Sequence, residues 1–308
     1  MQHHHAHALA VMAEHQLTGK VLAVCFDGTG LGTDSTIWGG EFLLCEVSDF
    51  VRVGHLKPIP MLGGDLSMQQ AWKTALCHLA AAGFTYGDEG NETVVRQAKD
   101  PRFPIIRKAL QQNINVIETS SMGRLFDAAA SLLGLADFNS HQGRCAMALE
   151  SAARVALREK VQPLPLAFAI EETVLGEDSN SSDASGKEII NNIKENSKNK
   201  NSFLKKVVYN PAPLWEALLK VKKESQEIYV AALGFQYAVV NMVIDTAQRM
   251  NVKQVVLAVG CFANRILLET CTKELQERGF QVYYNEAVSS GDGGISLGQA
   301  YYGVLQRA

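Results

Sequence analysis

Apolar residues along this chain follow two patterns, and segments of the two kinds alternate. Short continuous apolar runs at 21–26 and 255–259 predict buried strands, because a strand covered on both faces needs no polar positions. Longer segments place apolar residues three or four positions apart, which predicts helices. These helical segments are 8–12, 66–76, 105–117, 128–135, 144–161, 215–223, 228–249, 264–275 and 295–305. Strands alternating with helices predict an α/β fold.

Three further segments refine this outline. Residues 39–47 and 281–284 predict additional strands, and two prolines predict that 51–60 is an edge strand or a connector. Residues 177–202 are dominated by Asn, Ser, Lys, Asp and Glu, a composition that buries too little apolar surface to order itself. We expect them to form a disordered insertion in a loop. Residues 1–308 would then be one domain rather than two.

The composition argues against several classes of protein. A net charge of −3 gives no electrostatic footprint for nucleic acid, and no run of eighteen apolar residues predicts a membrane span. No signal peptide is visible, and none of the six cysteines is paired as CxxC, so a structural zinc site is not expected. Cysteines scattered among apolar residues are typical of buried thiols in a reducing compartment, so we expect a cytoplasmic protein.

The first residues carry the strongest chemical signal. His3 and His7 are four positions apart, which on a helix puts both imidazoles on one face, where they can share a divalent metal ion. A histidine run beside the initiator Met is also typical of a purification tag, but Ala6 interrupts this run and an amphipathic segment follows at once. His4 and His5 are expected to point elsewhere, either behind the ligands or to the surface.

Two glycine-rich loops each carry one aspartate. Asp27 follows the first buried strand, where Gly28 and Gly30 predict a tight loop with backbone amides open to phosphate oxygens. Asp292 precedes the last helix in a similar loop. An Asp-Gly pair alone is typical of an ordinary turn. Combined with the histidine pair, the two acids predict a site of two imidazoles and two carboxylates.

Blocks from the first residues to the last helix together resemble one family, the C-terminal catalytic domain of the HypF-type carbamoyltransferases within the Kae1/TsaD superfamily. The resembling blocks are 2–7, 27–32, 37–42, 55–58, 63–65, 119–128, 264–267 and 292–300. The block at 119–128 is the most HypF-like. The resemblance implies an actin-like (ASKHA) two-lobe nucleotide-binding fold.

The resemblance also implies roles for single residues. His3, His7, Asp27 and Asp292 would hold a divalent iron or zinc ion and carry the catalysis. The nucleotide, ATP or carbamoyl-adenylate, would be bound by Gly28, Gly30, Asp127, Gly143, Glu150, Gly260 and Asn264. Within that set, Asp127 and Glu150 would contact the ribose and Asn264 the adenosine side. The family transfers a carbamoyl group from carbamoyl-adenylate to the C-terminal cysteine of a HypE-type partner during nickel–iron hydrogenase maturation.

This sequence departs from the family pattern in two ways. The family's acylphosphatase-like, zinc-finger and YrdC-like domains are missing, and so is the first part of the N-terminal lobe. We therefore expect an incomplete lobe with an unpaired sheet edge, and upstream domains supplied by a separate chain. Val259 also stands where the family usually has the first glycine of a pair.

Two other functions stay open at this point. Val259 and the incomplete lobe favour a nucleotide- or metal-binding scaffold, or a remnant, that does not turn over. A tRNA threonylcarbamoyl transferase is the sister branch, but the block at 120–127 and the acidic net charge argue against it.

Overall fold

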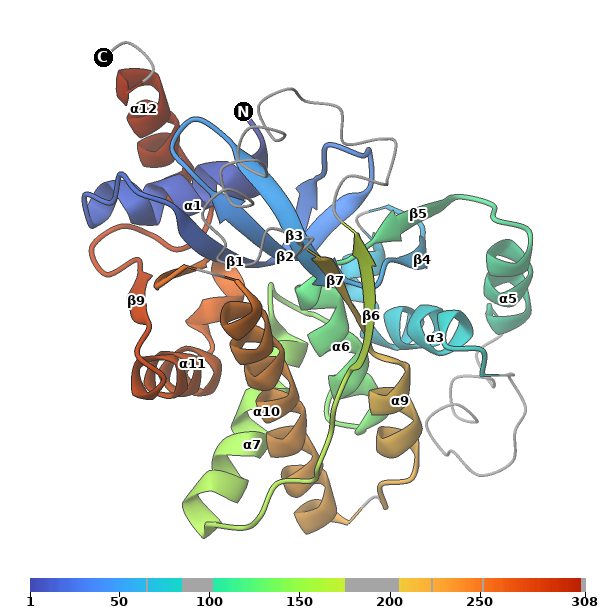
Figure 1. Ribbon diagram of the computed structural model, residues 1–308. Helices are drawn as coiled ribbons and strands as arrows, with labels where there is room; N and C mark the ends of the chain where they lie inside the picture. The colour runs from blue at the N-terminus through green and yellow to red at the C-terminus, as the bar shows by residue number, and fades with distance from the viewer. Residues whose placement is uncertain (65, 85–101, 175–204, 223, 251, 306–308) are drawn as a thin grey trace.

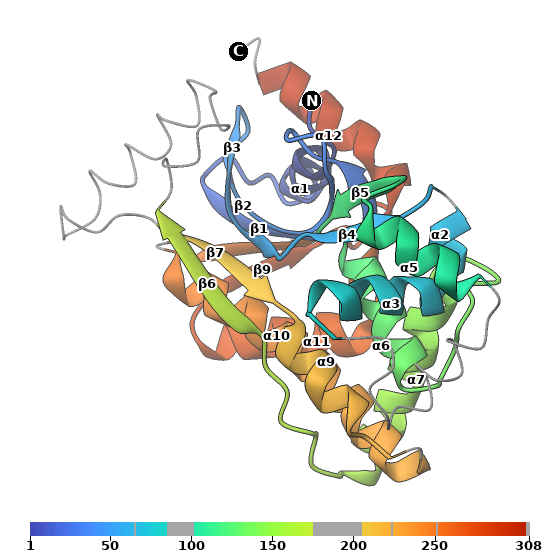
Figure 2. The ribbon, with the colours of Figure 1, turned by 90° about the vertical axis from the view of Figure 1, so that its right-hand side faces the viewer.

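A computed structural model describes residues 1–64, 66–84, 102–174, 205–222, 224–250 and 252–305. The described residues form a mixed nine-stranded sheet with helices on both faces (Figures 1 and 2). The α/β prediction is therefore confirmed. The predicted insertion at 177–202 lies outside the described residues.

The middle of the sheet is the hairpin of β1 (Val21–Leu31) and β2 (Ile37–Cys45), with β8 (Gln254–Ala258) parallel to β1 on its other side. The sheet path runs β6-β7-β3-β2-β1-β8-β9, and β4 and β5 pair with each other beside β2. The remaining strands are β3 (Phe50–Leu56), β4 (Ile59–Leu62), β5 (Val116–Thr119), β6 (Ala169–Val174), β7 (Lys205–Asn210) and β9 (Gln281–Tyr284).

Side chains of β1 alternate strictly between two apolar clusters. Leu22, Val24 and Phe26 belong to the large cluster on one face, whereas Val21, Ala23 and Cys25 belong to a smaller cluster on the other. This alternation follows from the period of two in any strand. The apolar run is continuous because both faces of β1 are covered.

The large cluster lies under six helices. They are α3 (Ala71–Ala81), α6 (Met122–Leu132), α7 (Arg144–Glu159), α9 (Ala212–Leu219), α10 (Ser225–Arg249) and α11 (Arg265–Glu277). Helix α10 is long and apolar enough to cross a membrane, but 67% of its most apolar window is buried inside the protein. Its apolar character is therefore explained by its position in the protein core.

The smaller cluster lies under α1 (His3–Glu14), with α12 (Ile295–Leu305) packed along α1 (Figure 1). The two helices approach closely at Gly298, where a Cβ atom would overlap the carbonyl oxygen of Ala6. This contact joins the two ends of the described chain on one face of the sheet. The remaining short elements are α2 (Leu66–Gln69), α5 (Phe103–Gln111), η1 (Gly260–Ala263) and η2 (Asp292–Gly294).

Two local predictions are wrong, and a third holds only in part. Residues 27–32 are not a free loop, because β1 continues to Leu31 and pairs with β2 up to the turn. Residues 51–56 are not an edge, because β7 pairs with β3 on the side away from β2, whereas Pro58 lies in the connector and Pro60 in β4, which pairs only with β5 among the described strands. The helix predicted over 105–117 ends at Gln111, since Asn113 and Asn115 adopt positive φ and the chain then enters β5.

Candidate metal centre

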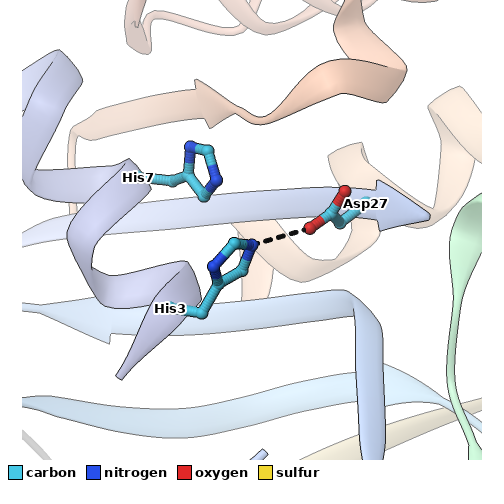
Figure 3. Close-up of side chains that lie close together, drawn as sticks. All are labelled: His3, His7 and Asp27. Carbon is cyan, nitrogen blue, oxygen red and sulfur yellow. Dashed lines mark hydrogen bonds and ion pairs between the residues drawn. The ribbon is translucent and has the colours of Figure 1, made fainter. Parts of the chain in front are cut away.

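The start of α1 places two imidazoles one turn apart. The side chain of Gln2 caps the helix, with its Oε1 accepting a hydrogen bond of 2.8 Å from the backbone N–H of His5. The rings of His3 and His7 lie edge to face, with centroids 4.7 Å apart. Both face Asp27 on β1 (Figure 3).

The position of the Asp27 side chain follows from the alternation of side chains along β1 and from a bulge in that strand. It continues the alternation of Val21, Ala23 and Cys25, so its side chain belongs on the α1 face. The register pairs Phe26 with Gly40 and Gly30 with Trp38, so residues 27–29 form a bulge opposite a single residue of β2. Bulges of this kind re-aim side chains next to active sites.

Four polar side chains converge at this point. His3 Nε2 lies 3.1 Å from Asp27 Oδ2, and the donor atoms of His3, His7 and Asp27 all lie within 4.8 Å of one another. Asp292, in η2, reaches in from the other end of the chain, with Oδ1 3.5 Å from His7 Nε2 and 3.9 Å from His3 Nε2. The structure thus brings together all four residues that the sequence suggested.

The electrostatics of the cluster suit a cation. The hydrogen bond to Asp27 raises the pKa of His3 despite its partial burial, whereas burial, reinforced by His3, lowers the pKa of His7. Burial opposes ionisation of Asp27, but the hydrogen bond from His3 and the nearby His4 outweigh it and lower the pKa of that carboxyl. The site therefore holds an ionised carboxylate beside a neutral imidazole.

One orphaned atom tests whether a metal ion fits here. His7 is 2% exposed, and its buried Nε2 makes no hydrogen bond among the described residues, although Asp292 Oδ1 lies 3.5 Å away. A buried unpaired ring nitrogen is costly unless it has a ligand. Imidazole nitrogens with carboxylate oxygens suit zinc and iron. The residues fit a divalent cation, and their role as its ligands stays a prediction.

Gly28 in the bulge and Gly30 just after it both have structural uses. The backbone N–H of Gly28 donates to its neighbour Asp27 at Oδ1, 2.6 Å away, so this amide is not free for a phosphate. A Cβ at Gly30 would lie 2.5 Å from His4 Cε1 and 2.6 Å from His3 Cδ2. Position 30 has no room for a side chain, because the imidazoles of His3 and His4 occupy that space. The expectation that these glycines open a loop for phosphate is not what the geometry shows.

Asp127 lies in the interior. It is 1% exposed, its Oδ2 accepts from Arg124 at 2.8 Å, and its Oδ1 accepts from Asn139 at 3.0 Å. Burial raises the pKa of this carboxyl in spite of Arg124. Both oxygens are engaged within the protein, so in this conformation Asp127 does not offer one to a ribose.

Three of the other nucleotide candidates lie around the first turn of α11. Asn264 caps that helix by accepting from Leu267 N at 3.1 Å, and Glu150 of α7 accepts from Arg265 N at the same distance. Gly260 begins η1 just before, and a Cβ there would meet nothing within 4 Å. Gly143 is the N-cap of α7, the helix that carries Glu150. The dipole at the N-terminus of α11 favours negative charge, and two of its amides already donate to Glu150 and Asn264.

Sequence reasoning missed one group that supports the site and one buried ion pair between β2 and β3. Ser121, the cap of α6, donates to Gly28 O at 2.7 Å and accepts from Arg124 N, which ties α6 to the bulge. The cap pattern of Ser before a helix was a usable signal. Glu41 is fully buried and pairs with Arg52 at 2.6 Å, and this charge lowers the pKa of Glu41 against the effect of burial. No local pattern marks that pair.

The comparisons with known proteins fit this geometry. The fold and the cluster define an α/β protein with two imidazoles and two carboxylates gathered beside the central hairpin. Residues 23–299 match the family described as "Carbamoyltransferase, Kae1-like Domain, second subdomain", so the chain belongs to that family.

Named relatives and solved structures agree. Carbamoyltransferase HypF2 of Cupriavidus necator is 34% identical over 310 residues, covering 100% of this chain and 36% of that protein. A Carbamoyltransferase HypF homolog of the same organism is 31% identical, covering 99% of this chain and 71% of its own length. Full-length HypF in a phosphate- and nucleotide-bound form superposes with a TM-score of 0.75 at 32% identity, over 98% of this chain and 35% of that one.

A second solved structure, T. kodakarensis HypF, gives a TM-score of 0.73 at 26% identity, over 99% of this chain and 36% of that one. The chain therefore spans about a third of the length of most of these relatives. The fold is that of the HypF carbamoyltransferases.

Proposed function

We propose that this chain is the carbamoyl-transferring domain of a HypF-type system. It would move a carbamoyl group from carbamoyl-adenylate to the C-terminal cysteine thiol of a HypE-type partner, in the maturation of nickel–iron hydrogenase. The observation that carries the proposal is the convergence of His3, His7, Asp27 and Asp292 in a chain that belongs to this family. An adenylate-forming domain of the HypF type would supply the carbamoyl-adenylate.

In this proposal the four side chains hold a divalent iron or zinc ion. When bound, the ion supplies Lewis-acid polarisation of the carbamoyl carbonyl or neutralises phosphate charge. Transfer forms a bond from the partner's sulfur to the carbamoyl carbon and breaks the bond from that carbon to the adenylate oxygen, which leaves with AMP. The thiol proton goes to solvent. The protein contributes position and charge stabilisation.

The properties of the cysteines in this chain favour a nucleophilic thiol that comes from a partner protein. Cys25, Cys45, Cys77, Cys145 and Cys271 are buried, and burial raises the pKa of each thiol. Burial also raises the pKa of Cys261, and Asp27 adds to that effect. A thiol that stays protonated is a poor nucleophile.

The test is carbamoylation of the partner's terminal cysteine, followed by mass spectrometry of the intact partner. The purified chain is combined with the candidate adenylate-forming protein, ATP and carbamoyl phosphate. We expect a mass gain of one carbamoyl group with the unaltered chain and none with His7→Ala. His141→Ala, at an exposed histidine, is the control and should transfer normally. Absence of transfer by the unaltered chain would contradict the proposal.

One observation favours a second candidate, a binding scaffold without turnover. Val259, 1% exposed, has φ 80° and ψ 169°, a region that glycine alone visits easily. It lies directly before Gly260 and η1, which leads into α11. Calorimetry with ATP separates the two functions, because tight binding of ATP without carbamoyl transfer would favour the scaffold.

A further inference from the structure

His4, which follows the first candidate ligand, is buried behind the cluster. It is fully buried, and its Nε2 has no hydrogen-bond partner among the residues that the structure describes. That nitrogen lies 3.7 Å from Asp27 Oδ2. The ring rests against the backbone of Gly30, where no side chain intervenes. A buried histidine directed at a candidate ligand without bonding it needs an explanation.

A chain of hydrogen bonds fixes which nitrogen of His4 carries its proton. The N–H of His5 donates to Gln2, so the accepting atom must be the amide oxygen Oε1. The amide nitrogen of Gln2 then lies 3.1 Å from His4 Nδ1 and 3.3 Å from Leu31 O. An amide nitrogen only donates, so Nδ1 must accept. The imidazole therefore carries its proton on Nε2, the atom nearest Asp27.

The ring nitrogen of a metal ligand must present a lone pair, which His4 Nε2 in this tautomer does not. His3 is in the opposite situation. It is hydrogen-bonded to Asp27 Oδ2 now, and a His3 that gives its Nε2 lone pair to a cation can no longer donate to that oxygen. Asp27 Oδ1 keeps the N–H of Gly28, so Oδ2 is the oxygen that loses a donor.

We propose that His4 is a positioning residue that donates its Nε2–H to Asp27 Oδ2 when the site is loaded, and that Gln2 holds His4 in the required tautomer. This inference rests on the metal site of the proposed function. Ligating carboxylates are held by such outer hydrogen bonds, and losing one costs about 10- to 100-fold in metal affinity.

Two matched variants at Gln2 and two at His4 isolate the hydrogen bond. Gln2→Glu keeps an oxygen for the His5 N–H but replaces the amide nitrogen with an acceptor, which requires a proton on His4 Nδ1 and leaves a lone pair facing Asp27. Gln2→Ala removes the group that selects the His4 tautomer without favouring the other tautomer. His4→Phe keeps the ring without a donor, and His4→Gln offers an amide N–H near the place of Nε2–H.

The first measurement needs no metal. Nitrogen-15 NMR of histidine-labelled protein distinguishes protonated from unprotonated ring nitrogens, and His4→Gln assigns the His4 signals by their loss. We expect a protonated Nε2 in the unaltered protein and a protonated Nδ1 in Gln2→Glu. A protonated Nδ1 in the unaltered protein would overturn the inference.

The second measurement is Zn²⁺ affinity by competition with a chelator, with the absorption spectrum of the Co²⁺ form as a report on the ligands. Relative to the unaltered chain, we expect Gln2→Glu and His4→Phe to lose about 10- to 100-fold in affinity. We expect His4→Gln to recover most of that loss, and the Co²⁺ spectrum to stay the same in every variant. A changed Co²⁺ spectrum in His4→Gln would make His4 a ligand and overturn the inference.

The two proposals fail in different ways. If the unaltered chain binds no Zn²⁺, the metal site itself is wrong, and the role of His4 fails with it. If the unaltered chain binds Zn²⁺ and Gln2→Glu binds equally well, only the role of His4 is wrong. Urea unfolding of each metal-free variant separates a loss of affinity from a loss of folded protein, and His141→Gln controls for adventitious binding at an exposed histidine.

Discussion

The two faces of the central sheet are packed in opposite ways. On one face, Leu22, Val24 and Phe26 of β1 meet a large apolar core under six helices. On the other, the smaller Ala23 and Cys25 lie under α1, whose buried residues include His4, His5 and His7. Small strand residues allow α1 to lie close to the sheet, which brings its imidazoles within reach of Asp27.

The contrast indicates a division of labour. Apolar burial stabilises in proportion to area, so most of the folding free energy comes from the large face. Buried imidazoles and a carboxylate contribute little to folding and bring desolvation costs, and functional sites tolerate such costs. Substitutions on the large face should therefore unfold the protein, whereas those on the α1 face should change metal binding.

The largest expected effect belongs to the large face. Leu132, fully buried at the far end of α6, leaves a cavity when it is changed to alanine. We expect Leu132→Ala to lower the free energy of unfolding by about 2–5 kcal/mol, measured by urea denaturation. Zn²⁺ affinity of the molecules that remain folded should not change. An equal loss of Zn²⁺ affinity in Leu132→Ala would show that the two faces do not have separate roles.

On the α1 face, His7→Ala should have the reverse profile. Zn²⁺ affinity should fall more than 100-fold, or by about 3 kcal/mol, because a ligand is lost. The metal-free protein should keep its stability within about 1 kcal/mol, since the imidazole that is removed had an unpaired buried nitrogen. Chelator competition and urea denaturation check the two halves. A large loss of metal-free stability would mean that the face is structural.

A third prediction uses the pH dependence of the large face. His78 is buried with neither ring nitrogen hydrogen-bonded among the described residues, and burial lowers its pKa to about 3. Below pH 6.5 this residue is protonated in the unfolded chain but stays neutral in the folded chain. The free energy of unfolding therefore falls as the pH drops from 6.5 towards 3. The slope is about 1.4 kcal/mol per pH unit. In His78→Phe that part of the slope should vanish in urea titrations at pH 4, 5 and 6.5, and an unchanged slope would contradict the assignment.

The smallest effect concerns Val259, which ends the apolar run at 255–259. Val259→Ala keeps the Cβ strain and loses buried surface, whereas Val259→Gly loses the surface but relieves the strain. We expect the glycine variant to be more stable than the alanine variant by about 1 kcal/mol, the reverse of their usual order inside secondary structure. Thermal unfolding of the two variants measures the difference. The usual order would show that the backbone there is unstrained.

Part of this molecule was predictable because it depends on neighbours in sequence. The 3.6-residue period of α1 puts His3 and His7 on one face, and the period of two in β1 puts Asp27 on the face of Ala23 and Cys25. Strand periodicity failed at Leu31, since pairing across the hairpin extended β1 beyond its apolar run. The prolines at 58 and 60 correctly marked a connector and a strand paired on one side, but they did not show that residues 205–210 cover the strand before them.

The sequence by itself determined the α/β class, the helix that carries the histidines and the kinds of side chain available for a metal site. Only the tertiary structure decided that Asp292 meets His7, because the two are 285 positions apart and are joined by the packing of α12 on α1. It likewise decided that Asp127 is satisfied internally and that His4 is directed at Asp27. Local periodicity sets the direction of a side chain, but which partner it meets depends on packing between segments far apart in the chain.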